Sequence, residues 1–264
     1  MESVSSDNSS VLCPLCGDTH VNQFFIDQRR SYMHCEGCSL VFVPKVFHLN
    51  KADEKRQYDL HQNSLQDEGY RKFLGRVSEP LILRLPDGSR GLDFGCGPGP
   101  TLSHILEEAG HHMDIYDPYY SPNKFFKTKK YDFITATEVV EHFAEPGSEL
   151  DHLWSLINRG GWLAIMTKRV TSLEAFANWH YKNDPTHISF FCEFTFDFLA
   201  KNWETEAEFI GNDVVLFQKP HYTLLILGRL LVTTHLPTTA LKGICCYRQM
   251  RRVSSKTKII WYGS

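Results

Sequence analysis

A glycine-rich turn at residues 91–101 constrains the fold more than any other stretch of the sequence. The apolar Leu92 and Phe94 before it predict a strand, and a helix is expected to begin near Thr101. Three alternate glycines occupy the turn: Gly95, Gly97 and Gly99. Glycine adopts positive φ and lets a ligand approach the bare backbone, while a helix N-terminus offers unpaired N–H groups. The pattern therefore indicates an α/β fold with a polar or anionic ligand at the carboxyl end of this strand.

A second apolar run, residues 112–116, predicts another strand that ends at Asp117, 20 residues after Gly97. An acid at the end of the second strand of a Rossmann-like unit binds ribose hydroxyls. A dinucleotide site would show the spacing G-x-G-x-x-G. This turn shows G-x-G-x-G instead, which argues against NAD. Together the two features favour a ribose-containing ligand over a loop that binds nothing.

The run L-D-F-G-C-G-P-G at residues 92–99 resembles motif I of the class I S-adenosylmethionine (SAM) dependent methyltransferases. The resemblance implies that Asp93 lies beside the methionine part of SAM and that Asp117 holds its ribose. It implies further cofactor contacts in the turn and after the fourth strand, at Gly95, Cys96, Gly97, Gly99 and Glu138. The implied fold is a Rossmann-like, mostly parallel sheet of seven strands with flanking helices. Six strands are the alternative, because residues 117–130 leave little room for the usual third strand.

Two C-x-x-C pairs near the N-terminus, separated by 18 residues, predict a zinc ribbon over residues 11–44. The four thiolates of Cys13, Cys16, Cys35 and Cys38 can complete one tetrahedral zinc site. Such a closed site leaves no position for substrate, so its role is folding or docking. Redox-active thiols are the alternative. The run D-P-T-H-I-S-F-F at residues 184–191 resembles a family of bacterial methyltransferases that also carry the N-terminal cysteine pairs. This resemblance covers roughly residues 11–219 and names no substrate.

A second motif follows the predicted strand at residues 131–136 and reads T-E-V-V-E-H-F. On a helical turn, Glu138, Glu141 and His142 would share one face and could hold a divalent cation. The run resembles one that binds magnesium in some relatives, including ubiquinone-pathway O-methyltransferases and small-RNA 2′-O-methyltransferases. An active-site role without metal and a merely structural turn are the alternatives.

A loop at residues 176–191 follows the predicted fifth strand, at the sheet edge where the cofactor would bind. It carries His180 and His187, and a neutral imidazole there could take a proton from a substrate or bind a metal with Glu141. Candidate bases are therefore His142, His180 and His187, with Glu138 and Glu141 as metal-binding or orienting groups. The alternative is that the two loop histidines only hold the loop together.

The chain is expected to divide into five segments. They are a disordered start (1–10), the zinc ribbon (11–44), a helical cap or linker (45–90), the methyltransferase core (91–219) and a basic and apolar extension (220–264). The extension holds seven Lys or Arg and no acid, so the formal charge of −3 on the whole chain leaves −10 on residues 1–219. An acidic body would repel phosphate backbones, which favours a small-molecule acceptor.

The sequence therefore favours a SAM-dependent methyltransferase that acts on oxygen or nitrogen of a small molecule, with structural Zn²⁺ and, as an option, Mg²⁺. The second hypothesis is an RNA methyltransferase that uses the ribbon and the basic extension. The third is a catalytically silent binding module. The polar N-terminus predicts no signal peptide, and no apolar run is long enough for a transmembrane helix. Eight cysteines without a signal peptide favour the cytoplasm. The oligomeric state stays open.

Overall fold

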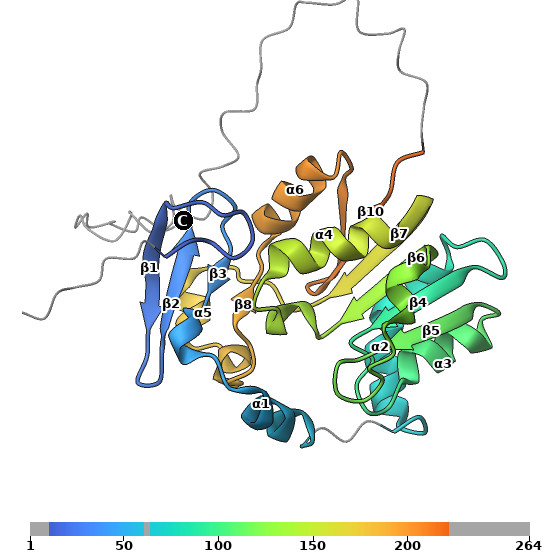
Figure 1. The fold of residues 1–264 in the computed structure, drawn as a ribbon, viewed down its shortest axis with the longest axis horizontal. Coiled ribbons are helices and arrows are strands. Elements are labelled where there is room, and N and C mark those ends of the chain that lie inside the picture. Colours follow the sequence, from blue (N-terminus) through green and yellow to red (C-terminus); the bar gives the residue numbers. More distant parts are fainter. Residues whose placement is uncertain (1–10, 61–63, 222–264) are drawn as a thin grey trace, which may run out of the picture.

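The computed structural model describes residues 11–60 and 64–221. Within them, a six-stranded sheet is covered by helices on both faces, and a four-stranded sheet lies beside it (Figure 1). The expectations for residues 1–10 and 222–264 lie outside the described part of the chain. No helix among the described residues is long and apolar enough to cross a membrane.

The larger sheet has the strand order β5-β4-β6-β7-β10-β9. Four parallel strands form one side of it: β5 (His112–Tyr116), β4 (Arg90–Phe94), β6 (Tyr131–Thr137) and β7 (Ile157–Met166). The strand β10 (Val214–Gln218) runs antiparallel to both β7 and β9 (Ala207–Ile210). This confirms the α/β class and the six-stranded alternative. Between β5 and β6 the chain forms only a short bridge and the 3₁₀ helix η2 (Lys124–Thr128).

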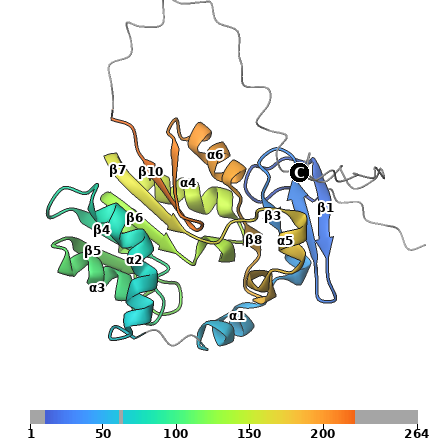
Figure 2. The ribbon, with the colours of Figure 1, turned by 180° about the vertical axis from the view of Figure 1, so that it is seen from behind.

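Two pairs of helices bury the two faces of this sheet. The helices α2 (Glu68–Ile82) and α3 (Thr101–Glu108) cover one face, and α4 (Pro146–Leu156) and α6 (Glu193–Asn202) cover the other (Figures 1 and 2). Side chains alternate along a strand, so Val214 and Leu216 of β10 pack under α2 and α3, while Val215 and Phe217 pack on the opposite side. Because helices cover both faces, side chains on both sides of a strand are buried, and the strands are therefore nearly continuous apolar runs.

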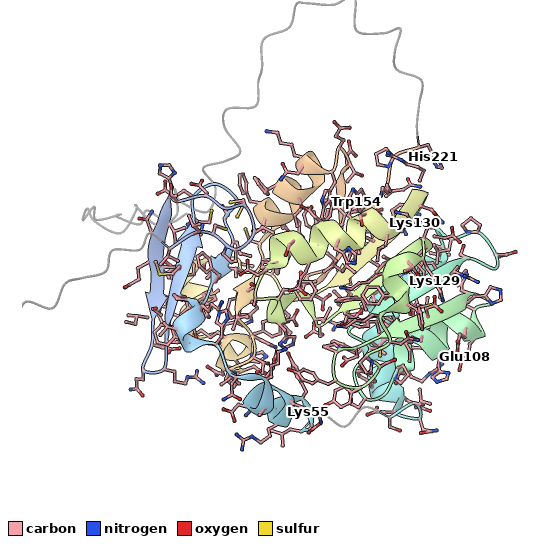
Figure 3. The ribbon with its side chains drawn as sticks, viewed as in Figure 1. Lys55, Glu108, Lys129, Lys130, Trp154 and His221 are labelled. Carbon is pink, nitrogen blue, oxygen red and sulfur yellow. The ribbon has the colours of Figure 1, made fainter. Side chains whose placement is uncertain are left out.

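The two helices of the second pair meet through tryptophans. The ring of Trp154, labelled in Figure 3, stacks on Trp203 with centroids 4.7 Å apart. The indole N–H of Trp203 donates to Asp151 at 2.8 Å, so its polar end is satisfied where the helices meet. This contact fixes α4, whose N-terminus follows the T-E-V-V-E-H-F motif.

The smaller sheet combines the cysteine-rich segment with a strand from much later in the chain. Its order is β1 (Val21–Ile26), β2 (Ser31–Cys35), β3 (Val41–Phe42) and β8 (Ser189–Phe190). Between β7 and β8 lie α5 (Leu173–Ala177) and the 3₁₀ helix η4 (His180–Asn183). The rings of Tyr32, Phe176 and Phe190 pack edge to face within this cluster. The ribbon therefore shares one core with the loop after β7.

The helix α1 (Lys51–Tyr58) lies between the ribbon and the larger sheet (Figure 1). The short 3₁₀ helix η1 (Lys45–Phe47) precedes α1. The amide oxygen of Asn50 caps the first turn of α1. None of the α1 residues is fully buried, and Tyr58 alone packs its ring against Tyr119 and His142. Hydrogen bonds add to this contact: the Tyr119 hydroxyl donates to Glu54 at 2.6 Å and the Tyr120 hydroxyl donates to Asp59 at 2.7 Å.

The glycine pair at residues 160 and 161 lies inside a strand and not in a turn before it, because β7 already begins at Ile157. The pairing with β6 shifts from Tyr131↔Ile157 to Phe133↔Trp162, so extra residues bulge out of the ladder. Gly160 lies in this bulge with φ of +77°, a conformation that glycine adopts without strain.

Candidate functional site

A cavity of about 850 Å³ opens at the carboxyl ends of β4, β5 and β6. It is lined by the glycine turn, by the residues after β5 and after β6, and by residues of the helices α1, α2 and α4. Asp184 and His187 of the loop after β7 complete the wall. The volume suits a small-molecule or cofactor site, and its position is where parallel α/β sheets bind ligands.

The glycine turn has the backbone shape that the sequence pattern implied. Gly95 and Gly97 have φ of +77° and +63°. A Cβ at Gly95 would lie 2.3 Å from Val139 Cγ2, whereas a Cβ at Gly97 would meet no atom within 4 Å. The backbone at Gly97 therefore faces open cavity, which leaves room for a ligand. The N–H of Gly97 also donates to Asp117 at 3.1 Å, so the acid after β5 braces the turn.

The two predicted cofactor acids occupy different places. Asp117 lines the cavity, and its other oxygen accepts from the backbone N–H groups of Tyr119 and Tyr120. Asp93 is buried beneath the turn, where it accepts from Thr135 Oγ1 at 2.9 Å and Ser103 Oγ at 3.1 Å. Burial raises the pKa of Asp93 to about 6, because the site disfavours its charged form.

The remaining predicted cofactor contacts divide in the same way. Gly95, Cys96, Gly97 and Glu138 lie in the cavity wall with Asp117. Asp93 and Gly99 do not belong to the lining residues. Asp93 therefore lies behind the turn and shapes it, whereas Gly99 is a partly exposed residue of the turn outside the cavity wall.

Glu138 and Glu141 do not share one face of a helix as expected. Glu138 has φ of +50° and stands before the 3₁₀ helix η3 (Val140–His142), so the helical spacing does not apply to it. The two carboxyl groups are linked instead by Tyr181, whose hydroxyl donates to Glu141 and lies 3.4 Å from Glu138 Oε2. One oxygen of each acid, and the Thr137 hydroxyl, have no hydrogen-bond partner among the described residues.

Burial makes both acids reluctant to ionise. It raises the pKa of Glu138 to about 8, with the nearby Glu141 charge as the second cause. It raises the pKa of Glu141 to about 7, against the hydrogen bond from Tyr181 that favours the charged form. Buried carboxyl oxygens without partners are costly, and a ligand or cation that contacts them would relieve that cost.

His142 and His187 both line the cavity, and each ring is held through its Nδ1. His142 Nδ1 lies 3.1 Å from the carbonyl oxygen of Thr186, and His187 Nδ1 lies 2.7 Å from that of Tyr181. A carbonyl oxygen only accepts, so each Nδ1 carries the proton and each neutral ring keeps its lone pair on Nε2. Burial lowers the pKa of both rings, that of His187 to about 3, with the neighbouring His142 as the second cause for His187.

The two imidazoles and one carboxyl group form a compact cluster. The rings of His142 and His187 have centroids 4.8 Å apart. One ligand atom from each of Glu141, His142 and His187 lies within 4.8 Å of the others. Glu138 was expected in this set and is not part of it, whereas His187 is. The arrangement can take a proton from a substrate or hold a divalent cation.

His180 is not brought into the cavity. It is exposed, and its Nε2 lies 3.2 Å from Lys168 Nζ. The residue that reaches the acids from this loop is its neighbour Tyr181, which sequence reasoning did not single out. The aromatic and histidine content of the loop marked the segment, but only the backbone path of η4 decides which side chain turns inward.

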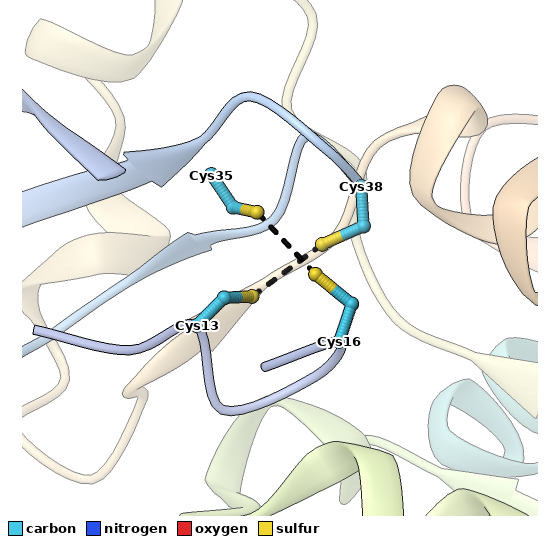
Figure 4. Close-up of side chains that lie close together, drawn as sticks. All are labelled: Cys13, Cys16, Cys35 and Cys38. Carbon is cyan, nitrogen blue, oxygen red and sulfur yellow. Dashed lines mark hydrogen bonds between the residues drawn. The ribbon is translucent and has the colours of Figure 1, made fainter. Parts of the chain in front are cut away.

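The four ribbon cysteines converge from two knuckles at one end of the smaller sheet (Figure 4). Their Sγ atoms approach to 3.5 Å for Cys13–Cys38 and 3.5 Å for Cys16–Cys35. This is far longer than a disulfide bond and close to the roughly 3.8 Å between thiolates around one tetrahedral zinc ion. The sulfur geometry therefore fits the zinc site that the spacing predicted.

Comparison with known proteins places the chain in a family. A family profile described as a methyltransferase domain matches residues 63–203, which is more than half of the chain. No curated protein matches the sequence.

Several solved structures resemble the chain in fold. One is 1,6-didemethyltoxoflavin-N1-methyltransferase of Burkholderia thailandensis, with 15% identity, a TM-score of 0.49, and coverage of 75% of this chain and 98% of that one. Another is magnesium protoporphyrin IX methyltransferase of Synechocystis, with 18% identity, a TM-score of 0.44, and coverage of 66% and 95%. An O-methyltransferase family protein of Burkholderia thailandensis has 13% identity and a TM-score of 0.42. The match covers 64% of this chain and only 58% of that protein.

Proposed function

The chain belongs to the class I methyltransferases through the match over residues 63–203, and on that premise we propose that it transfers a methyl group from SAM to a small molecule. The acceptor atom would be oxygen or nitrogen. The observation that carries the proposal is the cavity itself, whose wall joins the open backbone of Gly97 to the neutral imidazole of His187.

The residues of the glycine turn fit the cofactor. Gly95, Cys96 and Gly97 would lie against SAM, and Asp117 would accept hydrogen bonds from ribose hydroxyls. The acids that line the cavity also suit a ligand that carries positive charge. Asp93 would act from behind the turn, through Thr135 and Ser103, because it does not reach the cavity surface.

Bound SAM supplies a reactive methyl group, so the protein chiefly has to align the acceptor and manage its proton. His187 and His142 both keep a lone pair on Nε2, and either can take a proton from an acceptor O–H or N–H. His187 is the better candidate for the base, because Asp184 Oδ2 lies 3.8 Å from its Nε2 and would stabilise the imidazolium that forms. His180 is not proposed as a base, since it is exposed and lies outside the cavity wall.

A small acceptor is favoured over RNA by the charge of the cavity. Among the described residues that line it, Lys51 is the single lysine or arginine, against acids such as Glu54, Glu149 and Asp184. Such a wall repels phosphate groups. The basic residues of the extension at 220–264 would serve the RNA alternative, and a steep fall of substrate affinity with salt would favour that reading.

We include two metals in the proposal. Zinc at Cys13, Cys16, Cys35 and Cys38 is supported by the sulfur geometry, and the free thiols favour a reducing compartment such as the cytoplasm. A divalent cation such as Mg²⁺ at Glu141, His142 and His187 is the alternative to a histidine base, because it would take the Nε2 lone pairs of both rings. The unpartnered Glu141 oxygen supports this cation. The cation is also supported by the N–H of each imidazole donating to a carbonyl, as metal-bound histidines do. A rise in melting temperature with Mn²⁺ or Mg²⁺ that is absent in Glu141→Gln would support the cation.

The decisive experiment is a calorimetric titration of the zinc-loaded protein with SAM. We expect micromolar binding, reduced by about 100-fold or more in Gly97→Asp, because the new carboxylate would fill the space where the ligand approaches. Gly88→Asp is the matched control. Gly88 also has positive φ, +69°, and no atom within 4 Å of a built Cβ, but it lies in the turn before β4 and not in the cavity wall.

Absence of SAM binding by the folded protein would overturn the proposal. Equal loss of binding in the two glycine variants would show that the effect comes from backbone strain and not from the cavity. Binding of SAM without methyl transfer to any acceptor would leave the silent binding module as the better account.

A further inference from the structure

The ribbon is joined to the loop that carries His187 by continuous backbone pairing. Val41 and Phe42 of β3 pair with Phe190 and Ser189 of β8. The N–H of Val43 then donates to the carbonyl of Ile188 at 2.8 Å, one residue from His187. The end of the histidine loop is therefore a strand of the ribbon sheet.

A buried arginine of the ribbon holds the rest of that loop. Arg30 lies in the β1–β2 hairpin and is only 7% exposed. Its guanidinium donates to the carbonyl oxygens of Lys182 at 2.8 Å, Asp184 at 2.9 Å and Pro185 at 3.1 Å. Its Nε donates to the Tyr32 hydroxyl at 3.0 Å. The planar fork of donors suits this task, because several carbonyls of one bend can be satisfied by one rigid group.

The carbonyl oxygens of residues 181–186 accept hydrogen bonds either from the ribbon or from one of the two histidines. From Tyr181 to Thr186, the first carbonyl accepts from His187 and the last accepts from His142. Those between accept from the ribbon, three of them from Arg30 and that of Asn183 from Arg29 at 3.0 Å. One short segment is thus held from one side by arginines and holds the two imidazoles on its other side.

The zinc knuckle contacts the other half of the cluster. The N–H of Gly147, in the first turn of α4, lies 3.3 Å from the carbonyl oxygen of Pro14. A Cβ on Gly147 would lie 2.3 Å from the carbonyl oxygen of Leu15, so the two backbones are in close contact. Gly147 follows His142 by five residues. The ribbon therefore touches both segments that bring an imidazole to the cavity.

From these contacts we propose that Arg30 is a positioning residue for the methyl-accepting side of the site. By fixing the carbonyls of the 181–186 segment, it sets the ring orientation and the protonated nitrogen of His187 and His142. The assignment rests on the proposed methyl transfer for its meaning, but its structural content can be tested separately. It gives the ribbon a role in the reaction although the cysteine site itself is closed to substrate.

The test compares Arg30→Met with Arg84→Met in the zinc-loaded full chain. Arg84 also donates to a backbone carbonyl, that of Pro80 at 2.5 Å, and pairs with Glu208, but it lies away from the ribbon. With ¹⁵N-labelled histidine, the ring-nitrogen spectra report which nitrogen carries the proton. We expect His187 and His142 in Arg30→Met to change from the single Nδ1–H form to a mixture of tautomers, and both to keep that form in Arg84→Met.

Hydrogen exchange supplies the second readout. Amides of residues 180–188 should exchange at least tenfold faster in Arg30→Met, while zinc content and SAM affinity stay at their original values. Arg30→Lys keeps the charge but not the fork, and it should give a partial recovery of both signals. If Arg30→Met fails to fold, Arg30→Lys carries the same comparison.

Unchanged histidine spectra and unchanged exchange in a folded Arg30→Met protein would overturn the proposal. Loss of zinc together with the change would also overturn it, because the effect would then be collapse of the ribbon. Failure of the original protein to bind SAM would instead remove the proposed function, and the spectra would still decide whether Arg30 orders the histidines.

Discussion

The two sides of the cavity are built in different ways. The proposed cofactor side comes from one short stretch of chain, in which β4, the glycine turn and Asp117 are close in sequence and hydrogen-bond one another. The proposed acceptor side combines His142, His187 and Tyr181 with Arg30, which lies more than 150 residues from the loop it holds. The first side is therefore encoded locally, whereas the second exists only when the ribbon is folded against the core.

The difference predicts that damage to the ribbon and damage to the glycine turn have separable consequences. Loss of the ribbon should disorder the histidines and spare SAM binding. Loss of the turn should abolish SAM binding and spare the cysteine site. Each variant below tests one side and uses the other as its reference.

The largest effect is expected for Cys35→Ser. Cys35 is fully buried, and a structural zinc site contributes on the order of 10 kcal/mol to the fold around it. We expect zinc content to fall to background, and hydrogen exchange to rise over residues 13–43 and 180–190. Exchange in β4–β6 should stay slow, and SAM affinity should change by less than about threefold.

Cys192→Ser is the matched control, because this buried thiol lies outside the cysteine cluster. It should keep its zinc and its exchange pattern. Loss of SAM binding in Cys35→Ser at the same level as the loss of zinc would show that the two sides are one cooperative unit.

The next effect is expected for Gly95→Ala. The positive φ costs an alanine about 1–2 kcal/mol, and the contact 2.3 Å from Val139 Cγ2 adds overpacking of about 1–3 kcal/mol. Urea unfolding should show a loss of about 2–5 kcal/mol, with SAM binding lost and zinc retained. Gly97→Ala has the same unfavourable φ without the clash, so its loss of stability should be only about 1–2 kcal/mol.

The double variant Gly95→Ala with Val139→Ala separates the two causes. Removing the Val139 methyl groups should recover the part of the loss that comes from the clash. No recovery would mean that backbone strain alone accounts for the effect.

The sequence could predict the shape of the glycine turn and the cysteine cluster, because their determinants are local. The glycine spacing, the position of Asp117 and the cysteine pairs each depend on a few neighbouring residues. The six-stranded outcome was also visible, since residues 117–130 left little room for a third strand, and the structure forms only η2 there. The role of Asp93 was less visible, because burial behind the turn depends on Thr135 of another strand.

The acceptor side could not be predicted in the same way. The shared helical face of Glu138, Glu141 and His142 failed because Glu138 takes a positive φ that ends β6 before any helix begins. From the sequence, His180 and His187 were equally good candidates for the base. The backbone path through η4 directs only His187 to the cavity wall. Tyr181 and Arg30 carry no motif, since their roles arise from contacts between segments far apart in the chain.

A moderate effect is expected for the pH dependence of Asp93→Asn. The pKa of Asp93 is raised to about 6 from its ordinary value of 3.8, so between these values the folded state binds more protons than the unfolded state. The free energy of unfolding of the original protein should therefore fall as pH rises from about 4 to about 6. The total fall is about 3 kcal/mol, and it stays constant above that range. The variant lacks this slope. Urea titrations at several pH values should therefore show that its free energy of unfolding rises relative to that of the original protein as pH increases from about 4 to about 6.

Ser103→Ala sharpens this result. The Ser103 hydroxyl stabilises the ionised form of Asp93, so its removal should push the slope to higher pH. A difference between original and variant that does not change with pH would contradict the buried, proton-retaining state of Asp93. A large loss of SAM affinity in Asp93→Asn at unchanged stability would favour direct contact with the cofactor.

The smallest effect is expected for Tyr119→Phe, which tests how α1 joins the two sides. The Tyr119 hydroxyl donates to Glu54 from the cofactor side, while Tyr58 of the same helix packs against the ring of His142 with centroids 5.1 Å apart. Loss of one such bond should cost about 1 kcal/mol, and SAM affinity measured by calorimetry should fall two- to fivefold. Tyr120→Phe is the control, because Asp59 keeps its ion pair with Lys55, so that its change should stay near zero. If Tyr119→Phe instead altered the His142 spectrum and left SAM affinity unchanged, α1 would belong with the ribbon and the histidines, and the boundary between the two sides would lie at the Tyr119–Glu54 contact rather than within the helix.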